Sequence, residues 1–215
     1  MKTVLLSPWL LLLLPAFASA QDSLHINRPV LLYGLATYDF PKSYGFTMGT
    51  SIPFYSIIKE KTNKDFKTQY AEKDEFISAE LGGYRHPFAY TAIIANAGIG
   101  IRYIKSTKHF TELSLNQGIV RTAYDGKVYE LDQDGNIKER KLFGRTYLAT
   151  GFSYSLNWSL NNGSSNSWFI QLKPAFWMQY PYNSFLRLHF SLQAGISYRL
   201  KNIALLSRTK YRHLL

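Results

Sequence analysis

The stretch from Phe185 to Leu200 limits most strongly what this chain can fold into. It reads FLRLHFSLQAGISYRL, and every even-numbered position from Leu186 on is apolar. The odd-numbered positions from Arg187 on are polar residues or glycine. A helix would spread these two classes around its circumference, whereas a strand separates them onto opposite faces. The pattern therefore predicts a single long strand with one apolar and one polar face.

The length of this predicted strand points to a membrane. At ~3.3 Å per residue it would extend about 50 Å, while strands of globular proteins usually have roughly 5–6 residues. A strand that crosses a bilayer needs about 9–11 residues. The stretch is thus long enough to cross a membrane and to continue above its surface.

The first twenty residues have the pattern of a secretory signal peptide. Lys2 supplies a positive start, an apolar run follows, and Ala18-Ser19-Ala20 matches a small-residue cleavage site. A transmembrane anchor is the alternative, but the apolar run is short and contains two prolines. We therefore expect these residues to be removed on export.

The composition of the chain excludes cysteine chemistry and shows a positive net charge. The chain has no cysteine, which excludes disulfides, cysteine-ligated metals and lipid attachment through cysteine. Without Lys2 the count is 24 Lys+Arg against 14 Asp+Glu, a formal charge of +10. In an exported protein this charge favours contact with anionic lipid head groups, or cations lining an interior, over nucleic acid. The aromatic residues that we expect at the membrane interfaces are Tyr44, Phe54, Tyr103, Tyr154, Trp158, Trp168 and Tyr180.

Alternation of this kind recurs in seven further stretches, although it is weak in the first of them. These are Val30–Tyr38, Tyr44–Ile57, Glu75–Arg85, Ala89–Ile104, His109–Thr122, Leu142–Leu160 and Ser167–Tyr180. Eight strands are the smallest common number for a closed membrane barrel. The sequence therefore predicts an all-β fold, a transmembrane antiparallel up-and-down β-barrel of about eight strands. An alternative count omits Val30–Tyr38 and uses Ile203–Arg212 as the last strand.

Charged residues gather in two connections between these stretches. We expect Lys59–Asp74 to lie outside the bilayer, and Asp125–Lys141 to form a projecting two-stranded extension, since its Asp134-Gly135 pair is a hairpin-turn signal. A water-soluble eight-stranded barrel of the lipocalin type, with an apolar interior, is the alternative. The polar strand faces are rich in Gly, Ser, Asn, Gln and Arg, while Lys and Glu are concentrated in the connections. This distribution favours a membrane barrel with its apolar faces outward.

The end of the long stretch resembles the assembly signal that closes outer-membrane β-barrels of Gram-negative bacteria. Gln193, Gly195, Tyr198 and Leu200 occupy the polar, glycine, aromatic and terminal apolar positions of that pattern. In architecture, the chain after the signal peptide is similar to the small outer-membrane β-barrel superfamily. This resemblance implies insertion by the barrel-assembly machinery into the bacterial outer membrane. The predicted organisation is a signal peptide at residues 1–20, an outer-membrane β-barrel at 21–200 and a cationic C-terminal tail at 201–215.

The strand parity also predicts a polar network inside the barrel. Arg102 and Glu112 flank a short turn, and a register with these two residues opposite each other satisfies the parity of both strands. The full set of expected inward charges is Glu80, Arg102, Glu112, Arg145, Lys173, Arg187 and Arg199. Such a set could line a channel or plug the interior. Eight strands leave an interior just wide enough for side chains to fill, which favours the plug.

No pattern in the sequence supports a catalytic, cofactor or metal site. Some small barrels modify lipid A, and those resembling lipid-A hydrolases carry a His, Ser and acid set on the outer surface. Here His189 and Ser191 both face inward by parity, and nothing brings a nucleophile, base and acid within reach.

The expected role is that of a non-enzymatic integral outer-membrane protein, either structural or an accessory subunit of a larger assembly. A narrow anion-preferring pore is the first alternative, because the inward cations outnumber the inward acids. A lipid-A-modifying enzyme is the second. The expected partners are outer-membrane lipids and lipopolysaccharide, the barrel-assembly machinery and a larger outer-membrane complex, with no nucleic acid.

Overall fold

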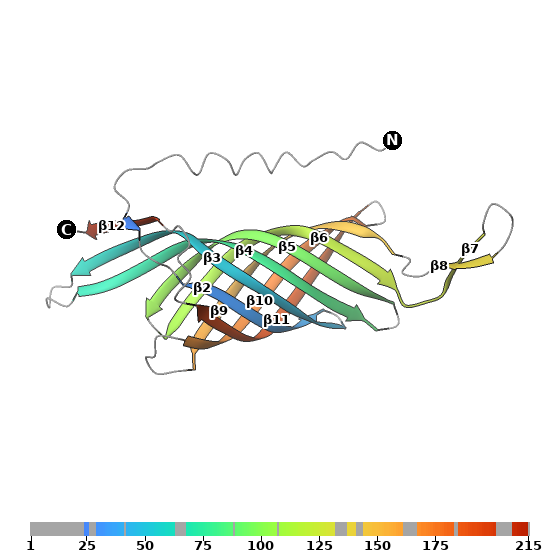
Figure 1. Cartoon of the computed structure of the whole chain (residues 1–215), viewed down its shortest axis with the longest axis horizontal. Coiled ribbons are helices and arrows are strands. Elements are labelled where there is room, and N and C mark those ends of the chain that lie inside the picture. Colours follow the sequence, from blue (N-terminus) through green and yellow to red (C-terminus); the bar gives the residue numbers. More distant parts are fainter. Residues whose placement is uncertain are drawn as a thin grey trace, which may run out of the picture.

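Eight strands of this computed structural model close into an antiparallel barrel (Figure 1). They are β2 (Val30–Asp39), β3 (Ser43–Thr62), β4 (Thr68–His86), β5 (Tyr90–Ser106), β6 (His109–Tyr124), β9 (Thr146–Ser159), β10 (Ser167–Tyr182) and β11 (Phe185–Leu200). Each strand pairs with the next, and β11 pairs with β2, which completes the ring. The predicted up-and-down barrel of eight strands is confirmed.

The structure describes most of the chain after the predicted signal peptide. The described residues are 24–25, 29–40, 42–62, 68–87, 89–106, 108–131, 137–140, 144–160, 167–182, 185–200 and 208–214. Residues 1–20 lie outside this set, as do the Asp134-Gly135 turn and residues 201–207. Within the described residues, no helix is long and apolar enough to cross a membrane.

Two structural features distinguish the ends of the barrel. One end carries the hairpin of β7 (Val128–Leu131) and β8 (Ile137–Arg140), which projects as predicted, and we call it the hairpin end (Figure 1). At the other end β2 begins and β11 finishes, and we call it the terminal end. There β12 (Arg208–Leu214) runs parallel to β3 and also pairs with the short β1 (Leu24–His25).

The structure corrects two predictions about the terminal end. Within Lys59–Asp74, the described residues 59–62 and 68–74 are not a connection, because β3 and β4 continue as a paired ribbon up to the Thr62–Thr68 pair. Its charges do not show a strand period because this ribbon extends past the barrel, so no single face has to be apolar. The alternative last strand at Ile203–Arg212 is also wrong, since Val30–Asp39 takes the barrel position and β12 lies on the outer part of β3.

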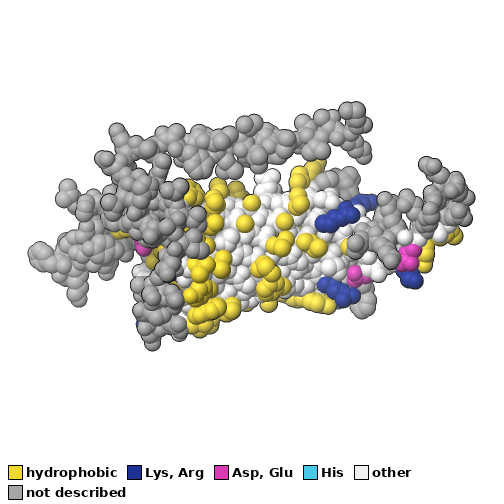
Figure 2. All heavy atoms as spheres, in the orientation of Figure 1, with side chains coloured by type: hydrophobic (Ala, Val, Ile, Leu, Met, Phe, Trp, Pro, Cys, Tyr) yellow, Lys and Arg dark blue, Asp and Glu magenta, His cyan; other side chains and the backbone are white. Residues whose placement is uncertain are grey.

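The outer surface of the barrel is apolar over its middle. The exposed side chains there include Ile77, Leu81, Ile99, Leu115, Ile119, Phe152, Leu188, Phe190, Leu192 and Ile196. Figure 2 shows hydrophobic side chains spread over the middle of the visible face, with Lys and Arg gathered toward the hairpin end. The interior instead contains many buried Ser, Asn, Gln and charged residues. This polarity is the reverse of a lipocalin-type soluble barrel.

Aromatic side chains border this apolar surface at both ends. Tyr44 and Tyr180 are exposed toward the hairpin end, and Trp158 and Trp168 toward the terminal end. The Trp168 ring also packs on Tyr198, with 4.7 Å between the ring centroids. Two interfacial bands of aromatic side chains follow, the arrangement that such residues adopt at membrane surfaces. Phe54, expected in the same set, is only half-exposed.

Apolar side chains also close the interior near each end. Leu31, Leu35, Phe110 and Phe169 form one buried cluster toward the terminal end. Toward the hairpin end a second cluster consists of Tyr84, Tyr90, Ala92, Val120, Tyr147 and Ala149. The first cluster explains the weak alternation of β2, whose inward positions Leu31, Tyr33 and Leu35 are apolar as well as its outward ones.

Candidate functional site: a polar network inside the barrel

The most deeply buried charge in the described structure belongs to Arg102. Its side chain is 1% exposed and comes from β5, directly opposite Glu112 on β6, the register that strand parity predicts. Arg102 Nε donates to Glu112 Oε1 at 2.7 Å, and Nη2 donates to Ser51 Oγ at 2.5 Å. The guanidinium carbon lies 5.4 Å from the Phe76 ring centroid and 5.3 Å from that of Phe110. Arg102 is thus held by an ion pair and two aromatic faces.

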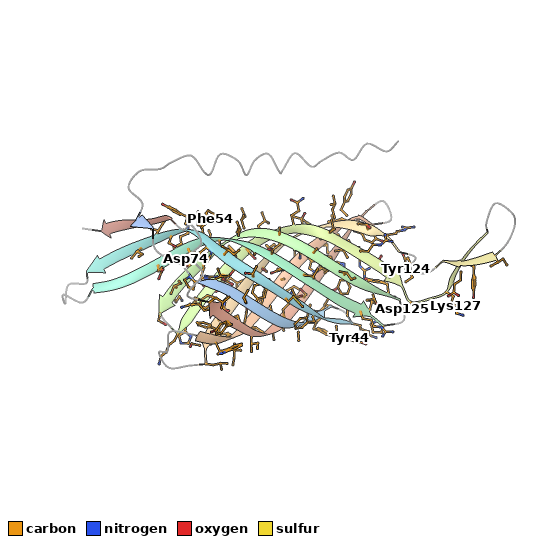
Figure 3. All side chains as sticks on the ribbon, in the orientation of Figure 1. Tyr44, Phe54, Asp74, Tyr124, Asp125 and Lys127 are labelled. Atoms are coloured by element: carbon orange, nitrogen blue, oxygen red, sulfur yellow. The ribbon has the colours of Figure 1, made fainter. Side chains whose placement is uncertain are left out.

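A second carboxylate, which is not in the set of inward charges predicted from the sequence, completes this cluster. Asp74 Oδ2 lies 3.9 Å from Arg102 Nη1, and Asp74 Oδ1 accepts a hydrogen bond from Ser56 Oγ at 2.6 Å. Glu112 Oε2 accepts from Ser155 Oγ at 3.0 Å. Figure 3 shows Asp74 toward the terminal end of the barrel. Every carboxylate here has a hydroxyl partner, as buried charges require.

A second charge cluster lies nearer the middle of the barrel. Lys173 Nζ on β10 donates to Glu80 Oε1 on β4, and the Tyr33 hydroxyl on β2 donates to the same oxygen at 2.7 Å. Lys173 Nζ is also 5.2 Å from the centroid of the Tyr33 ring. These three residues come from strands that are not all neighbours, so their contacts bridge the interior.

The third polar cluster centres on His189 toward the hairpin end. His189 Nδ1 lies 2.8 Å from Asp39 Oδ2, and Nε2 lies 3.1 Å from Gln179 Oε1. Its ring stacks on Trp177 with 3.6 Å between centroids. Asp39 is the last residue of β2 and is buried, although its neighbours in sequence predict only a turn.

The other three cations predicted to point inward differ in burial and contacts. Arg187 is half-buried and donates from Nη1 to the Tyr90 hydroxyl at 2.9 Å. Arg199 is also half-buried, and its guanidinium carbon lies 4.8 Å from the Phe169 ring centroid and 5.2 Å from that of Phe110. Arg145 is exposed, which corrects its assignment to the interior. It precedes the first residue of β9, so strand parity does not orient its side chain.

In the described interior, two small cavities lie on either side of the cluster formed by Tyr33, Glu80 and Lys173. One of about 60 Å³ is lined by Asp39, Ser191, Gln193 and the Glu80–Lys173 pair. The other, of about 10 Å³, is lined by the same pair and by Glu112. The larger space can hold a few water molecules, which are ordinary partners for buried oxygens such as Ser191 Oγ. The Glu80–Lys173 pair lies between these cavities, and the two apolar clusters lie toward the ends of the barrel.

The predicted assembly signal lies on the strand that closes the barrel. Gln193 is buried and lies opposite Lys173, while Tyr198 and Leu200 are half-exposed at the terminal end. Gly195 is required by a close approach, since a Cβ there would lie 2.2 Å from the carbonyl oxygen of Gly34 on β2. The glycine of the signal is therefore at the closing seam.

The polar clusters lack the arrangement that nucleophilic catalysis requires. Both ring nitrogens of His189 face Asp39 and Gln179, and Ser191 Oγ has no hydrogen-bond partner among the described residues. A serine nucleophile needs its base within hydrogen-bond reach. Elsewhere, His86 stacks on Tyr90 and His109 is exposed at the start of β6. In the described part of the chain, no group of three or more His, Cys, Asp or Glu side chains is arranged to hold a metal ion.

A closed ring of strands, an apolar belt between aromatic bands and a polar interior together define a membrane-spanning β-barrel. No protein-family model matches the chain, and no curated protein sequence matches it. The N-terminal β-barrel domain of Pseudomonas aeruginosa OprF is 13% identical, with a TM-score of 0.40, and the match covers 81% of this chain and 98% of that one. The β domain of the Bordetella autotransporter BrkA is 9% identical, with a TM-score of 0.35, covering 80% and 69%. A de novo designed transmembrane β-barrel is 13% identical, with a TM-score of 0.37, covering 83% and 100%.

Proposed function

We propose that this protein is a non-enzymatic integral protein of the bacterial outer membrane whose barrel does not conduct. The observation that carries the proposal is the filled interior. Arg102, Glu112 and Asp74 occupy one level, and Glu80 with Lys173 occupies another. Apolar clusters lie toward both ends. Buried charges that are already paired favour a structural core over a solute path.

The charge of the interior gives little support to an anion-preferring pore. Arg145 is exposed, while Asp39 and Asp74 are buried acids. The described interior therefore contains at least as many carboxylates as cations. The excess of inward positive charge that the sequence predicts, and on which the anion-preferring pore depends, is therefore not found among the described residues.

The surfaces available to a larger assembly lie outside the apolar belt. The β7–β8 hairpin projects from one end, and the β3–β4 ribbon with β12 projects from the other (Figure 1). We propose an accessory role in which one or both of these elements contact partner proteins. An even number of strands brings both ends of the barrel chain to one side, which we assign to the periplasm.

Conductance and location test the two parts of this proposal separately. Purified full-length protein in a planar bilayer should give no stable unit conductance. Stable, anion-selective conductance steps would contradict the proposal and favour the anion-preferring pore. In cells, the protein should fractionate with the outer membrane and require detergent for extraction. Recovery as a soluble periplasmic monomer would contradict a membrane barrel of any function.

The accessory role needs its own measurement. A photoreactive residue at Tyr129, which is exposed on β7, should cross-link to one defined protein in intact cells. The same residue placed at Leu188, which is exposed on the apolar belt, is the matched control and should cross-link mainly to lipid. Indistinguishable products at the two positions would count against a partner at the hairpin.

A further inference from the structure

Two arginines interrupt the apolar outer surface close to the hairpin end. Arg85 follows Leu81 on the outward face of β4, and Arg121 follows Ile119 on the outward face of β6. Both arginines are exposed, and so are the apolar residues that precede them. Each guanidinium therefore lies where the apolar belt gives way to the polar surface, the level of lipid head groups.

The pairing register brings these arginines to one patch. Arg121 lies opposite Ile93 on β5, and Arg85 lies opposite Thr91 on the same strand. With strands ~4.8 Å apart and ~3.3 Å per residue, the two Cα atoms are about 12 Å apart. Ile93 between them is an exposed, outward-facing apolar residue. Two long side chains at this separation can reach one ligand while an acyl chain lies on Ile93.

The aromatic band continues through the same patch. Tyr44 on β3 lies opposite Arg85 and is exposed, and Lys42 is exposed in the turn before β3. Together Lys42, Tyr44, Arg85, Ile93 and Arg121 form what we call the rim patch. It combines three cations, one interfacial aromatic ring and an apolar contact for a lipid chain.

The negative charge that the protein itself supplies to the rim patch is small. Arg121 Nη1 donates to Thr146 Oγ1 at 3.1 Å, and no carboxylate of the described residues lies within ion-pair distance of this arginine. Arg85 Nη2 is 3.6 Å from Asp125 Oδ2, a nitrogen–oxygen distance at the long end of the ion-pair range. Figure 3 shows Tyr44, Tyr124, Asp125 and Lys127 at this end of the barrel. Among the described residues, Asp125 is thus the one acid within ion-pair distance of Arg85 or Arg121.

We infer that the rim patch binds the phosphate groups of lipopolysaccharide in the outer leaflet. Guanidinium groups form paired hydrogen bonds with phosphate oxygens, and the exposed Ile93 suits the acyl chains below a phosphorylated sugar. The inference rests on the proposed outer-membrane location, with the hairpin end facing outward. It adds a ligand class and named residues to that proposal.

The experiment measures lipid binding by the full-length protein in detergent with native mass spectrometry. The probes are diphosphorylated lipid A and the same lipid A after removal of both phosphates. Wild-type protein should bind the phosphorylated probe about tenfold or more tightly than the dephosphorylated one. The double variant Arg85→Gln/Arg121→Gln should lose this preference. Equal binding of the two probes by the wild type would overturn the inference.

Control variants separate a local site from general charge. Lys105→Gln/Lys108→Gln removes two exposed cations at the terminal end and should leave lipid A binding unchanged. Arg85→Lys/Arg121→Lys keeps the charge but loses the guanidinium geometry, so it should retain only part of the preference. If the terminal-end control weakens binding as much as the arginine variant, the rim patch is not the site. Heat-modifiable gel mobility should show that all variants are folded.

Two competition measurements identify the molecule that supplies the phosphate. Vesicles of phosphatidylglycerol should compete poorly with lipid A, and equal competition would overturn the assignment to lipopolysaccharide. Millimolar inorganic phosphate should compete weakly, because it lacks the acyl chains. Cell fractionation is independent of these measurements. Correct outer-membrane fractionation without lipid A preference would therefore reject the rim patch and leave the proposed function standing.

Discussion

At the scale of single residues, the structure shows why the interior charges need one another. Arg102 is almost completely buried, and its two carboxylate partners come from different strands, Asp74 on β4 and Glu112 on β6. Removing one partner of a buried ion pair leaves an uncompensated charge, which typically costs roughly 3–5 kcal/mol. The loss should depend on which partner remains.

Arg102→Gln should destabilise the folded barrel more than Glu112→Gln. The first change leaves both Asp74 and Glu112 without their cation, whereas the second leaves Arg102 with Asp74 at 3.9 Å. The free energy of unfolding is measured from urea titrations followed by heat-modifiable gel mobility. Glu112→Gln as the more damaging single change would show that Asp74 does not share the charge of Arg102.

The double variant Arg102→Gln/Glu112→Gln should lose less stability than the sum of the two single variants, because it removes both charges of the pair and leaves only Asp74 without its cation. A water-filled lumen would screen both charges and reduce the coupling energy to the roughly 0–1 kcal/mol of an exposed pair. Additive single effects would thus argue for a hydrated path and return the pore to first place.

Leu192→Arg should destabilise the barrel by roughly 2–4 kcal/mol if this residue is near the bilayer midplane. Leu192 is 41% exposed on the apolar face, while its neighbour Gln193 is 8% exposed inside. Leu192→Met is the size-matched control and should have little effect. Gln193→Glu should also be milder, because it places the new charge opposite Lys173. Similar losses for Leu192→Arg and Gln193→Glu would mean that the faces of β11 are misassigned.

At the scale of elements, the sequence predicts best those segments whose two faces meet different surroundings. β11 alternates without interruption because one face meets lipid and the other the polar interior. β2 alternates weakly because Leu31 and Leu35 fill the interior end cluster. The β3–β4 ribbon carries charges in no strand period because it projects beyond the barrel, so its sequence indicates a connection instead of two strands. Asp39 and Asp74 are not predicted as interior acids for the same reason, since Asp39 follows the predicted strand Val30–Tyr38 and Asp74 ends the charged segment Lys59–Asp74.

Removal of residues 208–215 should leave the barrel folded, because β11 and β2 close it without β12. The outer part of β3, from Tyr55 to Lys61, would keep its pairing with β4 but lose its partner on the other edge, which would become exposed. Amide hydrogen exchange should therefore rise in that segment and stay unchanged in Leu31–Tyr38, which pairs elsewhere. Loss of the heat-modifiable folded band would show instead that β12 is needed for closure.

At the scale of the whole molecule, closure depends on one seam between the last and first barrel strands. Ten residue pairs join β11 to β2, from Ser191–Asp39 to Leu200–Val30. The eight strands and their facing could be predicted from the sequence because closure and lipid contact fix both. Apart from the Arg102–Glu112 pair on neighbouring strands, the contacts inside the barrel could not be predicted, because they join residues from strands far apart in the chain. Tyr33 and Glu80, for example, are 47 residues apart and share a hydrogen bond.

Gly195→Val should prevent stable closure, because the new side chain would meet the Gly34 carbonyl oxygen and the Leu35 Cα at the seam. Ala194→Val, one residue away on the exposed outer face, is the matched control and should be tolerated. The fraction of folded, heat-modifiable protein after refolding into detergent measures both. Normal refolding of Gly195→Val would mean that the seam has room that the structure does not show.

The parallel pairing of β12 with β3 also has a consequence for the order of assembly. Arg208 lies beside Tyr55, more than one hundred residues earlier in the chain, and only residues 201–207 join β12 to the end of β11. That tether spans at most about 25 Å, so β12 meets its partner edge at an effective concentration in the millimolar range once β11 is seated. Before that moment the two segments are separated by the whole unclosed sheet. We therefore expect β12 to pair with β3 late in assembly, after β11 has paired with β2. Formation of the β12–β3 pairing would then indicate that the barrel has closed.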